Sequence, residues 1–313
     1  MEAVDVSVGL VVRNAGAFLP KVLAHLEQQT YPAGRFEVVV ADRSSSDDTP
    51  AILEHHAEGS PVKLRTVSAD VSTMPAARNC ILRESRGRWV VFLDAELLAS
   101  PKLVETHIRA QDQHGGDCVV VGNIEPHPQA ARHARLRHFA PPDVEPFAHN
   151  QPLRFLDWRC WNLSAPRAQL VEAGGFDESL AVPGLEDVEL AWRLERTEMQ
   201  GYFNEQAVAY SWQQVNIERE VERRYSEGFT LWHVLGKTHS DVLANRYLGP
   251  SGRPWSASEL MLAPVYQRVC HSIAVHAGPF DWVCRRMART AVIQGYRDAK
   301  RGRPPRYEAG VTL

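Results

Sequence analysis

Residues 89–96 read WVVFLDAE: an uninterrupted apolar run, Trp89 to Leu93, leads directly into the two acids Asp94 and Glu96. A continuous apolar run of this length is typical of a strand buried on both faces, as in a parallel sheet. In open α/β sheets, ligands bind at the carboxyl ends of such strands. The stretch therefore predicts a strand that delivers two carboxylates to a crevice. There they can share a divalent cation with a diphosphate, although an acid-x-acid triplet alone is also typical of a solvated turn.

Apolar strands and amphipathic helices alternate on both sides of this stretch. Short apolar runs predict strands at residues 6–12, 36–41, 62–67 and 118–122. Helical spacing or helix-start residues predict helices over 19–29, from a start at 46–50, over 74–84 and over 104–111. This alternating order predicts a doubly wound α/β sheet with right-handed crossovers.

The alternation stops near Pro126. Residues 127–152 are rich in Pro, His and Arg and have no clean period, which predicts a long irregular segment around a substrate opening. Regular structure is predicted to resume over 158–164, 167–173 and 186–196, and the pattern after residue 217 is almost entirely helical. We therefore expect a first region over residues 1–217 and a helical region over 218–313.

The composition of the 313 residues is that of a globular protein. The formal net charge of -3 combines a basic stretch after residue 217 with an acidic remainder, which argues against extensive nucleic-acid binding. The five cysteines include no C-x-x-C pair, so a disulfide framework or a structural zinc site is not expected. No run approaches the ~18–20 apolar residues of a membrane span, and the first residues lack the basic segment of a signal peptide. We expect a cytoplasmic protein.

Polar residues also follow another predicted strand and begin two predicted helices. Asp42 ends the second strand, where it can hydrogen-bond a nucleobase or ribose, and the residues after it are typical helix caps. Arg78 lies near a helix start, where a guanidinium can meet a phosphate or form a surface ion pair. Glu186 and Asp187 begin a helix, where acids interact well with the helix dipole and one of them can act as a general base.

Taken in order, these motifs resemble the family 2 glycosyltransferases, inverting enzymes with a GT-A fold. The resemblance extends over roughly residues 6–212 and rests on the segments VSVGLVVRNAGAFLPKVLAHLEQQTYP, FEVVVADRSSSDDT, AARNCILRESRGRWVVFLDAE, LVEAGGFDESL and GLEDVELAWRL. It implies a GT-A fold, a Rossmann-like, doubly wound mixed sheet, followed here by a helical C-terminal extension. It also implies a nucleoside-diphosphate sugar as the donor.

The resemblance implies roles for individual residues by their position in these motifs. Asp187 matches the catalytic base, and Glu186 would orient the acceptor or neighbouring groups. Asp94 and Glu96 match the first and last positions of the family's Asp-x-Asp motif, which implies Mg²⁺ or Mn²⁺ held by Glu96 and Asp94. The residues implied in donor and nucleotide binding are Val11, Arg13, Asn14, Asp42, Arg78, Asp94 and Ala95.

Three positions depart from the family pattern. The Asp-x-Asp motif ends in Glu96, whose longer side chain moves the carboxylate. Ser211 occupies the position at which many members have a metal-ligating His. The site then keeps a weaker metal, uses His233 or His239, or works without one. The first strand ends in VVRN, residues 11–14, where the family often has Pro-Thr-Tyr-Asn, which alters how the base is held.

The acceptor side is less defined by these motifs. Indole faces stack well on sugar rings, which makes Trp158, Trp161 and Trp192 candidate acceptor contacts, although a Trp beside a strand is also typical of a core. The basic helical region has three competing uses: covering the acceptor site, forming a homodimer interface, or docking on anionic lipid at the inner face of the membrane. Covering the acceptor site is our first expectation, because the family usually varies its specificity there.

The sequence thus predicts an inverting glycosyltransferase that moves a sugar from a nucleotide donor to an acceptor hydroxyl. A glycan, a lipid-linked sugar, a peptide or a natural product would each supply that hydroxyl. The alternative is a non-catalytic nucleotide-sugar-binding or partner protein with a degenerate metal site, and the retained Asp187 argues against it. A nucleotidyltransferase is expected to carry a Gly-rich phosphate loop after the first strand, which VVRNAGAF does not supply.

Overall fold

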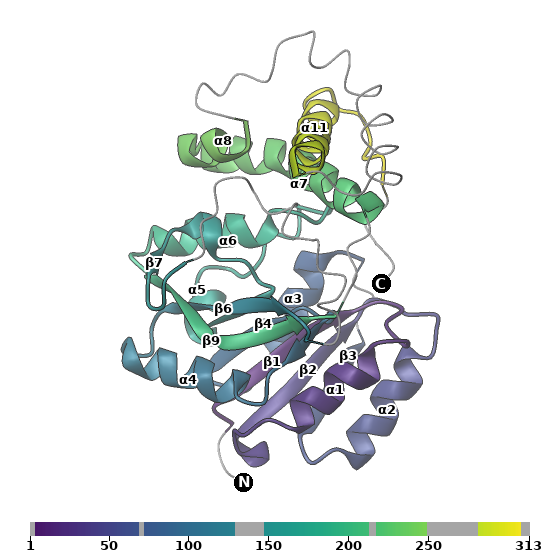
Figure 1. Ribbon diagram of the computed structural model, residues 1–313, viewed down its shortest axis with the longest axis vertical. Coiled ribbons are helices and arrows are strands. Elements are labelled where there is room, and N and C mark those ends of the chain that lie inside the picture. The colour runs from purple at the N-terminus through teal and green to yellow at the C-terminus, as the bar shows by residue number, and fades with distance from the viewer. Residues whose placement is uncertain (1–3, 69–71, 129–146, 213–216, 249–280, 308–313) are drawn as a thin grey trace.

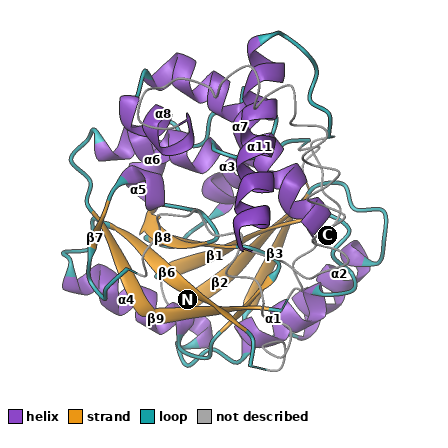
Figure 2. Ribbon diagram, turned by 45° about the horizontal axis from the view of Figure 1, so that its top comes forward, coloured by secondary structure: helices purple, strands orange, loops and turns teal. Residues whose placement is uncertain are grey.

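The computed structural model describes residues 4–68, 72–128, 147–212, 217–248 and 281–307 (Figure 1). Most of the irregular segment predicted over 127–152, and the middle of the helical C-terminal region, lie outside these residues. In the described part, the chain forms one mixed sheet with helices on both faces (Figure 2). Further helices stand at one end of the sheet (Figure 1).

The first half of the sheet is parallel, as the apolar runs predicted. Its strands, in spatial order β3-β2-β1-β4, are β1 (Val6–Val12), β2 (Phe36–Asp42), β3 (Lys63–Ser68) and β4 (Trp89–Leu93). The helices between them are α1 (Leu19–Glu27), α2 (Thr49–Gly59) and α3 (Met74–Glu84). The strand order reverses between β1 and β4, because β2 and β3 are added on one side of β1 and β4 on the other.

Local sequence explains why these helices form. The four buried residues of α1 recur at helical spacing and are Leu19, Val22, Leu23 and Leu26. The first turn of α3 is capped by Thr73, whose Oγ1 accepts a hydrogen bond from the Ala76 N–H over 3.3 Å. Pro75 lies in the same turn, where its missing N–H costs no hydrogen bond. The buried face of α1 therefore follows from apolar spacing, and the start of α3 from a capping residue, that the sequence displays.

The second half of the sheet mixes directions. β8 (Asn162–Pro166) pairs antiparallel with β4, and the order continues through β6 (Val119–Pro126), β9 (Gly201–Ser211) and β5 (Leu97–Ala99), with β7 (Pro152–Leu153) beside β9. The helix α4 (Leu103–Gln113) packs against β9 and β6. The predicted doubly wound mixed sheet is confirmed.

The segment predicted over 158–164 differs in the structure, because β7 already covers Pro152–Leu153 and β8 begins only at Asn162. The prediction began regular structure at Trp158, just after a short 3₁₀ turn over Phe155–Asp157. The backbone N–H of Cys160 explains the difference, because it donates to the Asp187 carboxylate over 3.2 Å instead of to a neighbouring strand. Residues 158–161 thus connect the start of β8 to Asp187, which lies in the helix over Glu186–Glu195.

Apolar side chains fill both faces of the sheet, as β4 illustrates. Val91 and Leu93 pack in the layer that contains α1 and α4. Val90 and Phe92 point the other way, into the layer that contains α3, α5 (Arg167–Glu172) and α6 (Glu186–Glu195). The strand is therefore buried on both sides, which accounts for its uninterrupted apolar sequence.

The described C-terminal helices are α7 (Ile217–Thr238), α8 (Asp241–Leu248) and α11 (Asp281–Lys300). α7 and α11 pack closely, since a Cβ on Gly228 would lie 1.8 Å from the carbonyl oxygen of Val292. α7 also contacts the loop before α6, where Thr230 Oγ1 donates to the Val182 carbonyl oxygen over 2.8 Å. Among the described helices, none is both long and apolar enough to cross a membrane.

Candidate active site

The reversal of strand order between β1 and β4 defines the candidate site. In open α/β sheets, a crevice forms outside the carboxyl ends of the strands at such a reversal. β1 runs out into Arg13 and Asn14, and β4 runs out into Asp94. The structure therefore brings together residues that the sequence analysis placed in separate motifs and predicted to bind the donor.

Asn14 and Asp42 are joined by the loop that follows β2. The Asn14 N–H donates to Ser45 Oγ over 2.8 Å, and that hydroxyl donates to Asp42 Oδ1 over 2.6 Å. The amide oxygen of Asn14 also accepts from the Ser46 N–H over 2.8 Å. Asn14 has φ 51°, a left-handed conformation that Asn tolerates better than most residues. These bonds fix the ends of β1 and β2 as one rim of the crevice.

Three arginines gather near this rim. Arg78 lies on α3 and is buried, and its Nη1 donates to Glu186 Oε1 over 2.6 Å. Arg43, directly after β2, is also buried, and its pKa is lowered by that burial and by the positive charges of Arg13 and Arg78. Like charges so close together are typical of a site that receives an anion.

The Arg78–Glu186 ion pair connects α3 to the first turn of α6. Glu186 Oε2 accepts a second hydrogen bond from the Gly184 N–H over 2.7 Å. Burial alone would favour the neutral acid, but the charge of Arg78 and the Gly184 N–H lower the pKa of Glu186 below its usual value. Glu186 is therefore a charged anchor that fixes the start of α6 at the crevice.

Asp94 and Glu96 form a tight turn at the end of β4. The Asp94 N–H donates to the Trp161 carbonyl oxygen over 2.8 Å, and Asp94 Oδ1 accepts from the Glu96 N–H over 3.1 Å. Burial raises the pKa of Asp94, against the opposing effects of the Glu96 N–H, Arg78 and Arg223. Ala95, between the two acids, is buried.

The turn formed by Asp94 and Glu96 offers too few ligands to hold a metal ion without the phosphate oxygens of a bound nucleotide. No group of three or more His, Cys, Asp or Glu side chains able to hold one ion occurs among the described residues, so His233 and His239 complete no such group. Ser211 pairs with Leu97 in the sheet and therefore lies next to Glu96. Mg²⁺ keeps several waters and often takes one or two carboxylates plus substrate phosphates. Asp94 and Glu96 fit an ion shared in that way with a diphosphate.

Asp187 is 3% exposed and lies beside Glu186. Its Oδ2 accepts from Arg159 Nε over 3.0 Å and from the Cys160 N–H over 3.2 Å, and its Oδ1 accepts from the Val188 N–H over 2.9 Å. Burial raises the pKa of Asp187 above its usual value; Arg159 opposes this and Glu186 adds to it. The site thus pairs a charged Glu186 with a neighbour that holds a proton more readily.

Arg159 is a site residue that the sequence did not reveal. Besides Asp187, its guanidinium donates from Nη2 to the Gly184 carbonyl oxygen over 3.1 Å and lies 3.6 Å from Glu227 Oε1 on α7. It also lies over the Trp161 ring, with Cζ 4.6 Å from the centroid. No local pattern around Arg159 signals its contacts with Asp187, Gly184 and Glu227, because these partners come from distant parts of the chain.

The three candidate acceptor tryptophans differ in exposure. Trp158 is 2% exposed, and its Nε1 donates to the Leu153 carbonyl oxygen, so it is a core residue with no ring face open to a sugar. The stacking role predicted for Trp158 is therefore not retained. Trp161 is half-buried under Arg159 and Arg223, and Trp192 is half-buried on α6 with Arg196 over its ring at 5.0 Å.

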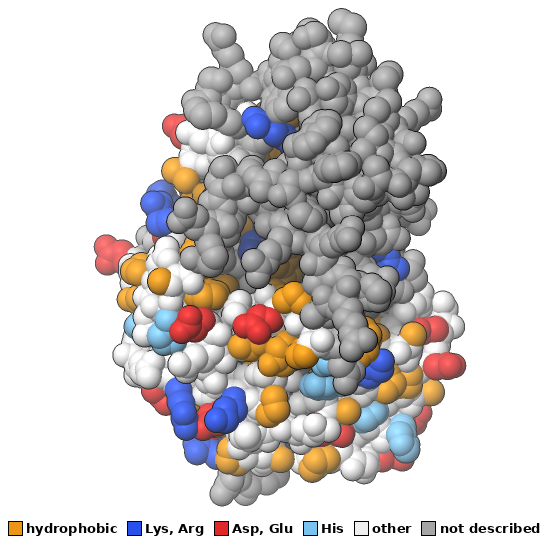
Figure 3. All heavy atoms as spheres, viewed as in Figure 1, with side chains coloured by type: hydrophobic (Ala, Val, Ile, Leu, Met, Phe, Trp, Pro, Cys, Tyr) orange, Lys and Arg blue, Asp and Glu red, His pale blue; other side chains and the backbone are white. Residues whose placement is uncertain are grey.

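The basic face predicted for the start of the helical region turns inward in part. Arg223 and Arg224 of α7 both pair with Glu220 and Glu227 of the same helix, at distances of 2.6–3.0 Å. Glu227 is buried, and the charge of Arg159 also lies near it. α7 therefore contributes charged side chains to the neighbourhood of Asp187. On the face drawn in Figure 3, basic and acidic side chains of the described residues are interspersed.

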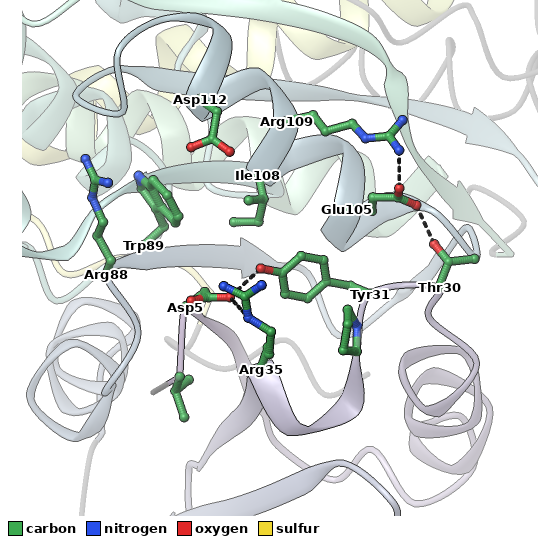
Figure 4. A pocket seen from close by; sticks show the side chains of 12 residues that line it. Asp5, Thr30, Tyr31, Arg35, Arg88, Trp89, Glu105, Ile108, Arg109 and Asp112 are labelled. Atoms are coloured by element: carbon green, nitrogen blue, oxygen red, sulfur yellow. Dashed lines mark hydrogen bonds and ion pairs between the residues drawn. The ribbon is translucent and has the colours of Figure 1, made fainter. Parts of the chain in front are cut away.

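A separate cavity of about 660 Å³ lies at the opposite, amino ends of β1 and β4. Its charged side chains largely pair with one another: Asp5 with Arg35 and Tyr31, and Glu105 with Arg109 (Figure 4). Asp5 contributes to raising the pKa of Tyr31 to about 12, after the larger effect of burial. None of the predicted site residues lines this cavity, so it is not the site of the motifs.

Several known proteins match this chain in sequence. A family model described as glycosyl transferase family 2 matches residues 7–176. Validoxylamine A glucosyltransferase of Streptomyces hygroscopicus subsp. jinggangensis is 28% identical over 216 residues, covering 60% of this chain and 50% of the relative. Poly(ribitol-phosphate) beta-N-acetylglucosaminyltransferase TarS of Staphylococcus aureus is 25% identical over 108 residues, 34% of this chain and 19% of the relative. The chain thus spans at most about half the length of these two relatives.

Solved structures resemble the whole described architecture. Mannosyltransferase PcManGT of Pyrobaculum calidifontis, in complex with GDP-Man and Mn²⁺, has a TM-score of 0.68 at 18% identity, covering 95% of this chain and 88% of that one. TarS residues 1–349 in complex with UDP have a TM-score of 0.55 at 17% identity, covering 96% and 92%. At these identities the likeness concerns the fold, and it confirms the predicted GT-A architecture.

Proposed function

The chain belongs to glycosyl transferase family 2, and on that premise we propose that it transfers a sugar from a nucleoside-diphosphate donor to an acceptor hydroxyl with inversion. The observation that carries this proposal is the position of Asp187. The Arg78–Glu186 ion pair of 2.6 Å ties the first turn of α6 to α3, at the crevice between β1 and β4. A buried carboxylate with a raised pKa thus lies beside the proposed donor site.

The rim of the crevice supports donor binding. Asp42 and Asn14, joined through Ser45, are proposed to contact the nucleobase and ribose. Arg13 and Arg78 are proposed to meet the phosphates, since guanidinium groups bind phosphate through paired N–H donors. Val11 and Ala95, at the ends of β1 and β4, are proposed to shape the walls of the pocket.

Asp94 and Glu96 are proposed to hold Mg²⁺ or Mn²⁺ together with the donor diphosphate. When bound, such an ion neutralises the charge that develops on the leaving nucleoside diphosphate. The two carboxylates would supply protein oxygens, and the donor would supply phosphate oxygens in place of a third protein ligand. Ser211 lies next to Glu96 and is a poor metal ligand. Metal binding would therefore depend on the phosphate oxygens of the nucleotide-sugar donor.

Asp187 is proposed to act as the general base. A carboxylate offers about four acceptor positions, of which three are used by Arg159, Cys160 and Val188 among the described residues. The remaining position is on Oδ1, which is where the proton of the acceptor hydroxyl would go. The hydroxyl oxygen bonds to the anomeric carbon as the bond to the diphosphate oxygen breaks, and that oxygen keeps the electron pair.

The C-terminal helices are proposed to form part of the acceptor side. Arg159 bridges Asp187 to Glu227 of α7, and α7 packs on the loop that precedes α6. These contacts favour the first of the three predicted uses, covering the acceptor site, over a detached dimerisation or lipid-docking element. Trp161 and Trp192, both half-buried, remain the proposed acceptor contacts.

A donor titration tests the proposal. UDP, GDP and dTDP with their common sugars are titrated by calorimetry in the presence of Mg²⁺, Mn²⁺ or EDTA, and donor consumption is followed by mass spectrometry. Tight binding of one donor and its slow hydrolysis, or its transfer to an added acceptor, are expected. Tight binding of a donor that is never consumed with any acceptor would favour a non-catalytic nucleotide-sugar-binding protein. No binding of any nucleotide would contradict the proposal.

A further inference from the structure

Arg223 of α7 lies near the end of β4 although it belongs to the C-terminal helical region. Its guanidinium lies over the indole of Trp161, with Cζ 5.5 Å from the ring centroid. The carbonyl oxygen of Trp161 accepts the hydrogen bond that anchors the Asp94 N–H. Trp161 thus connects Arg223 to the strand end at which the donor diphosphate is proposed to lie.

The hydrogen bonds of Arg223 leave one edge of its guanidinium available. Nε and Nη2 donate to Glu220 over 2.8 and 2.6 Å, and Nη1 donates to Glu227 over 2.9 Å. A guanidinium carries five N–H groups, so one N–H remains on Nη1 and one on Nη2 with no partner among the described residues. Two N–H groups on neighbouring nitrogens of a guanidinium can bind two oxygens of a phosphate.

Arg224, the next residue, shows that this arrangement is not general for the helix. It pairs with the same two acids, Glu220 and Glu227, over 2.8 and 3.0 Å. Its side chain is only 10% exposed, against 38% for Arg223, and only Arg223 lies over Trp161. The two arginines therefore share their acidic partners and differ in access to the end of β4.

We infer that Arg223 is a donor-binding residue whose paired Nη1 and Nη2 groups contact the diphosphate of the nucleotide sugar. The inference rests on the proposed function and adds a residue from the C-terminal region to the donor site. When the bond between the anomeric carbon and the diphosphate oxygen breaks, the electron pair stays on that oxygen. Arg223 stabilises the added negative charge without giving up a proton, because the guanidinium remains charged.

The role also accounts for the sparse set of metal ligands. Ser211 offers no strong metal ligand next to Glu96, so the diphosphate needs positive charge from another source. Arg223 supplies a fixed charge from α7, held in place by Glu220, Glu227 and Trp161. On this account the diphosphate binds measurably even when divalent metal is removed.

The test compares nucleotides that differ by one phosphate. UDP and UMP, GDP and GMP, and dTDP and dTMP are titrated by calorimetry, with Mg²⁺ and with EDTA, into the full chain and its R223A, R223K and R224A variants. R223A is expected to weaken diphosphate binding about tenfold or more, as for a charge-assisted hydrogen bond, and monophosphate binding by less than about threefold. R224A removes ion pairs with the same two acids, Glu220 and Glu227. It is expected to leave the ratio of diphosphate affinity to monophosphate affinity unchanged.

The outcomes separate this inference from the proposed function. Equal loss of diphosphate and monophosphate binding in R223A, or the same change of ratio in R224A, would overturn the role of Arg223 and leave the donor site standing. Failure of the unmodified chain to bind any of these nucleotides would overturn both. Should R223A fail to fold by circular dichroism, R223K decides the question. Lys keeps the positive charge but loses the paired N–H groups of the guanidinium. An unchanged ratio of diphosphate to monophosphate affinity in R223K would contradict a paired contact with the diphosphate, and a reduced ratio would support it.

Discussion

Arg159 Nε donates a hydrogen bond of 3.0 Å to Asp187 Oδ2, and the same guanidinium reaches Glu227 of the C-terminal helix α7. The proposed base is therefore not held by its own helix alone. A residue just before β8 fixes its carboxylate, and the C-terminal helices in turn fix that residue. The proposed catalytic geometry of this family 2 glycosyltransferase thus depends on segments that lie outside the motifs of the family.

Arg159→Gln tests whether this contact sets the proton affinity of the base. A nearby positive charge stabilises the carboxylate, so removing it raises the pKa of Asp187 further. The base must be deprotonated to act, so the acidic limb of the pH profile of kcat is expected to move to higher pH. Arg154→Gln is the control, because Arg154 lies in the same segment but is exposed and pairs with Glu195. An unmoved acidic limb in Arg159→Gln would remove this role from Arg159.

Gly184→Ala tests whether α7 must dock on the loop before α6. A Cβ at Gly184 would lie 2.8 Å from the Glu227 Cα, a backbone atom that can yield only if the helix shifts. Overpacking of this kind costs about 1–3 kcal/mol, and transfer activity is expected to fall because Glu227 moves away from Arg159. Urea unfolding and a transfer assay measure the two effects. Gly59→Ala is the control, because a Cβ there would have no neighbour within 4 Å, and it should change stability and transfer activity little. A Gly184→Ala variant with unchanged stability and activity would contradict the close packing of α7 on this loop.

Glu96→Gln tests the proposed metal site. The amide keeps the shape of the side chain but binds a divalent cation less well. Because even a supporting group of a metal site contributes about 10–100-fold in affinity, the apparent affinity for Mg²⁺ or Mn²⁺ in donor turnover is expected to fall at least about tenfold. Glu125→Gln, an exposed acid hydrogen-bonded to Asn123, is the control. The metal assignment fails if both variants keep the metal dependence of the unmodified chain.

The two neighbouring tryptophans are expected to behave differently on truncation. Trp158→Ala removes a side chain from the core and is expected to cost about 3–5 kcal/mol of unfolding free energy. Trp161→Ala removes a half-buried ring under Arg159 and Arg223, so a smaller loss of stability and a larger loss of donor binding and transfer are expected. Denaturant unfolding and calorimetry on both variants check this contrast. Equal effects on stability would contradict the assigned environments.

The parts of the fold that the sequence predicted well are those set by local pattern. β1, α3 and β4 have the predicted bounds, because apolar runs and caps within each segment determine them. Asp94 lies at a strand end, and its position at the crevice follows from the sheet alone. Regular structure was predicted from Trp158, but β8 begins only at Asn162, because Cys160 bonds to Asp187 and not to a neighbouring strand.

Residues that reach the site through long-range contacts were not predictable in this way. Nothing adjacent to Arg159 indicates that Asp187, Gly184 and Glu227 converge on it. On α7, Glu220 and Glu227 lie three or four residues from Arg223 and Arg224, a spacing that signals ion pairs within the helix. That spacing does not reveal the direction in which the arginines point, which depends on how α7 packs on the loop before α6.

The central claim is that Asp187 is the general base, and Asp187→Asn tests it most directly. The substitution keeps the size of the side chain and removes its ability to take a proton, so kcat is expected to fall about 10²–10⁴-fold while donor binding changes by no more than a few-fold. Glu189→Gln is the matched control, since Glu189 is a buried acid of the same helix turn that pairs with Arg193. The account predicts that Asp187→Asn loses transfer activity but keeps donor binding, and that Glu189→Gln keeps both. Near-normal turnover in Asp187→Asn would contradict the account.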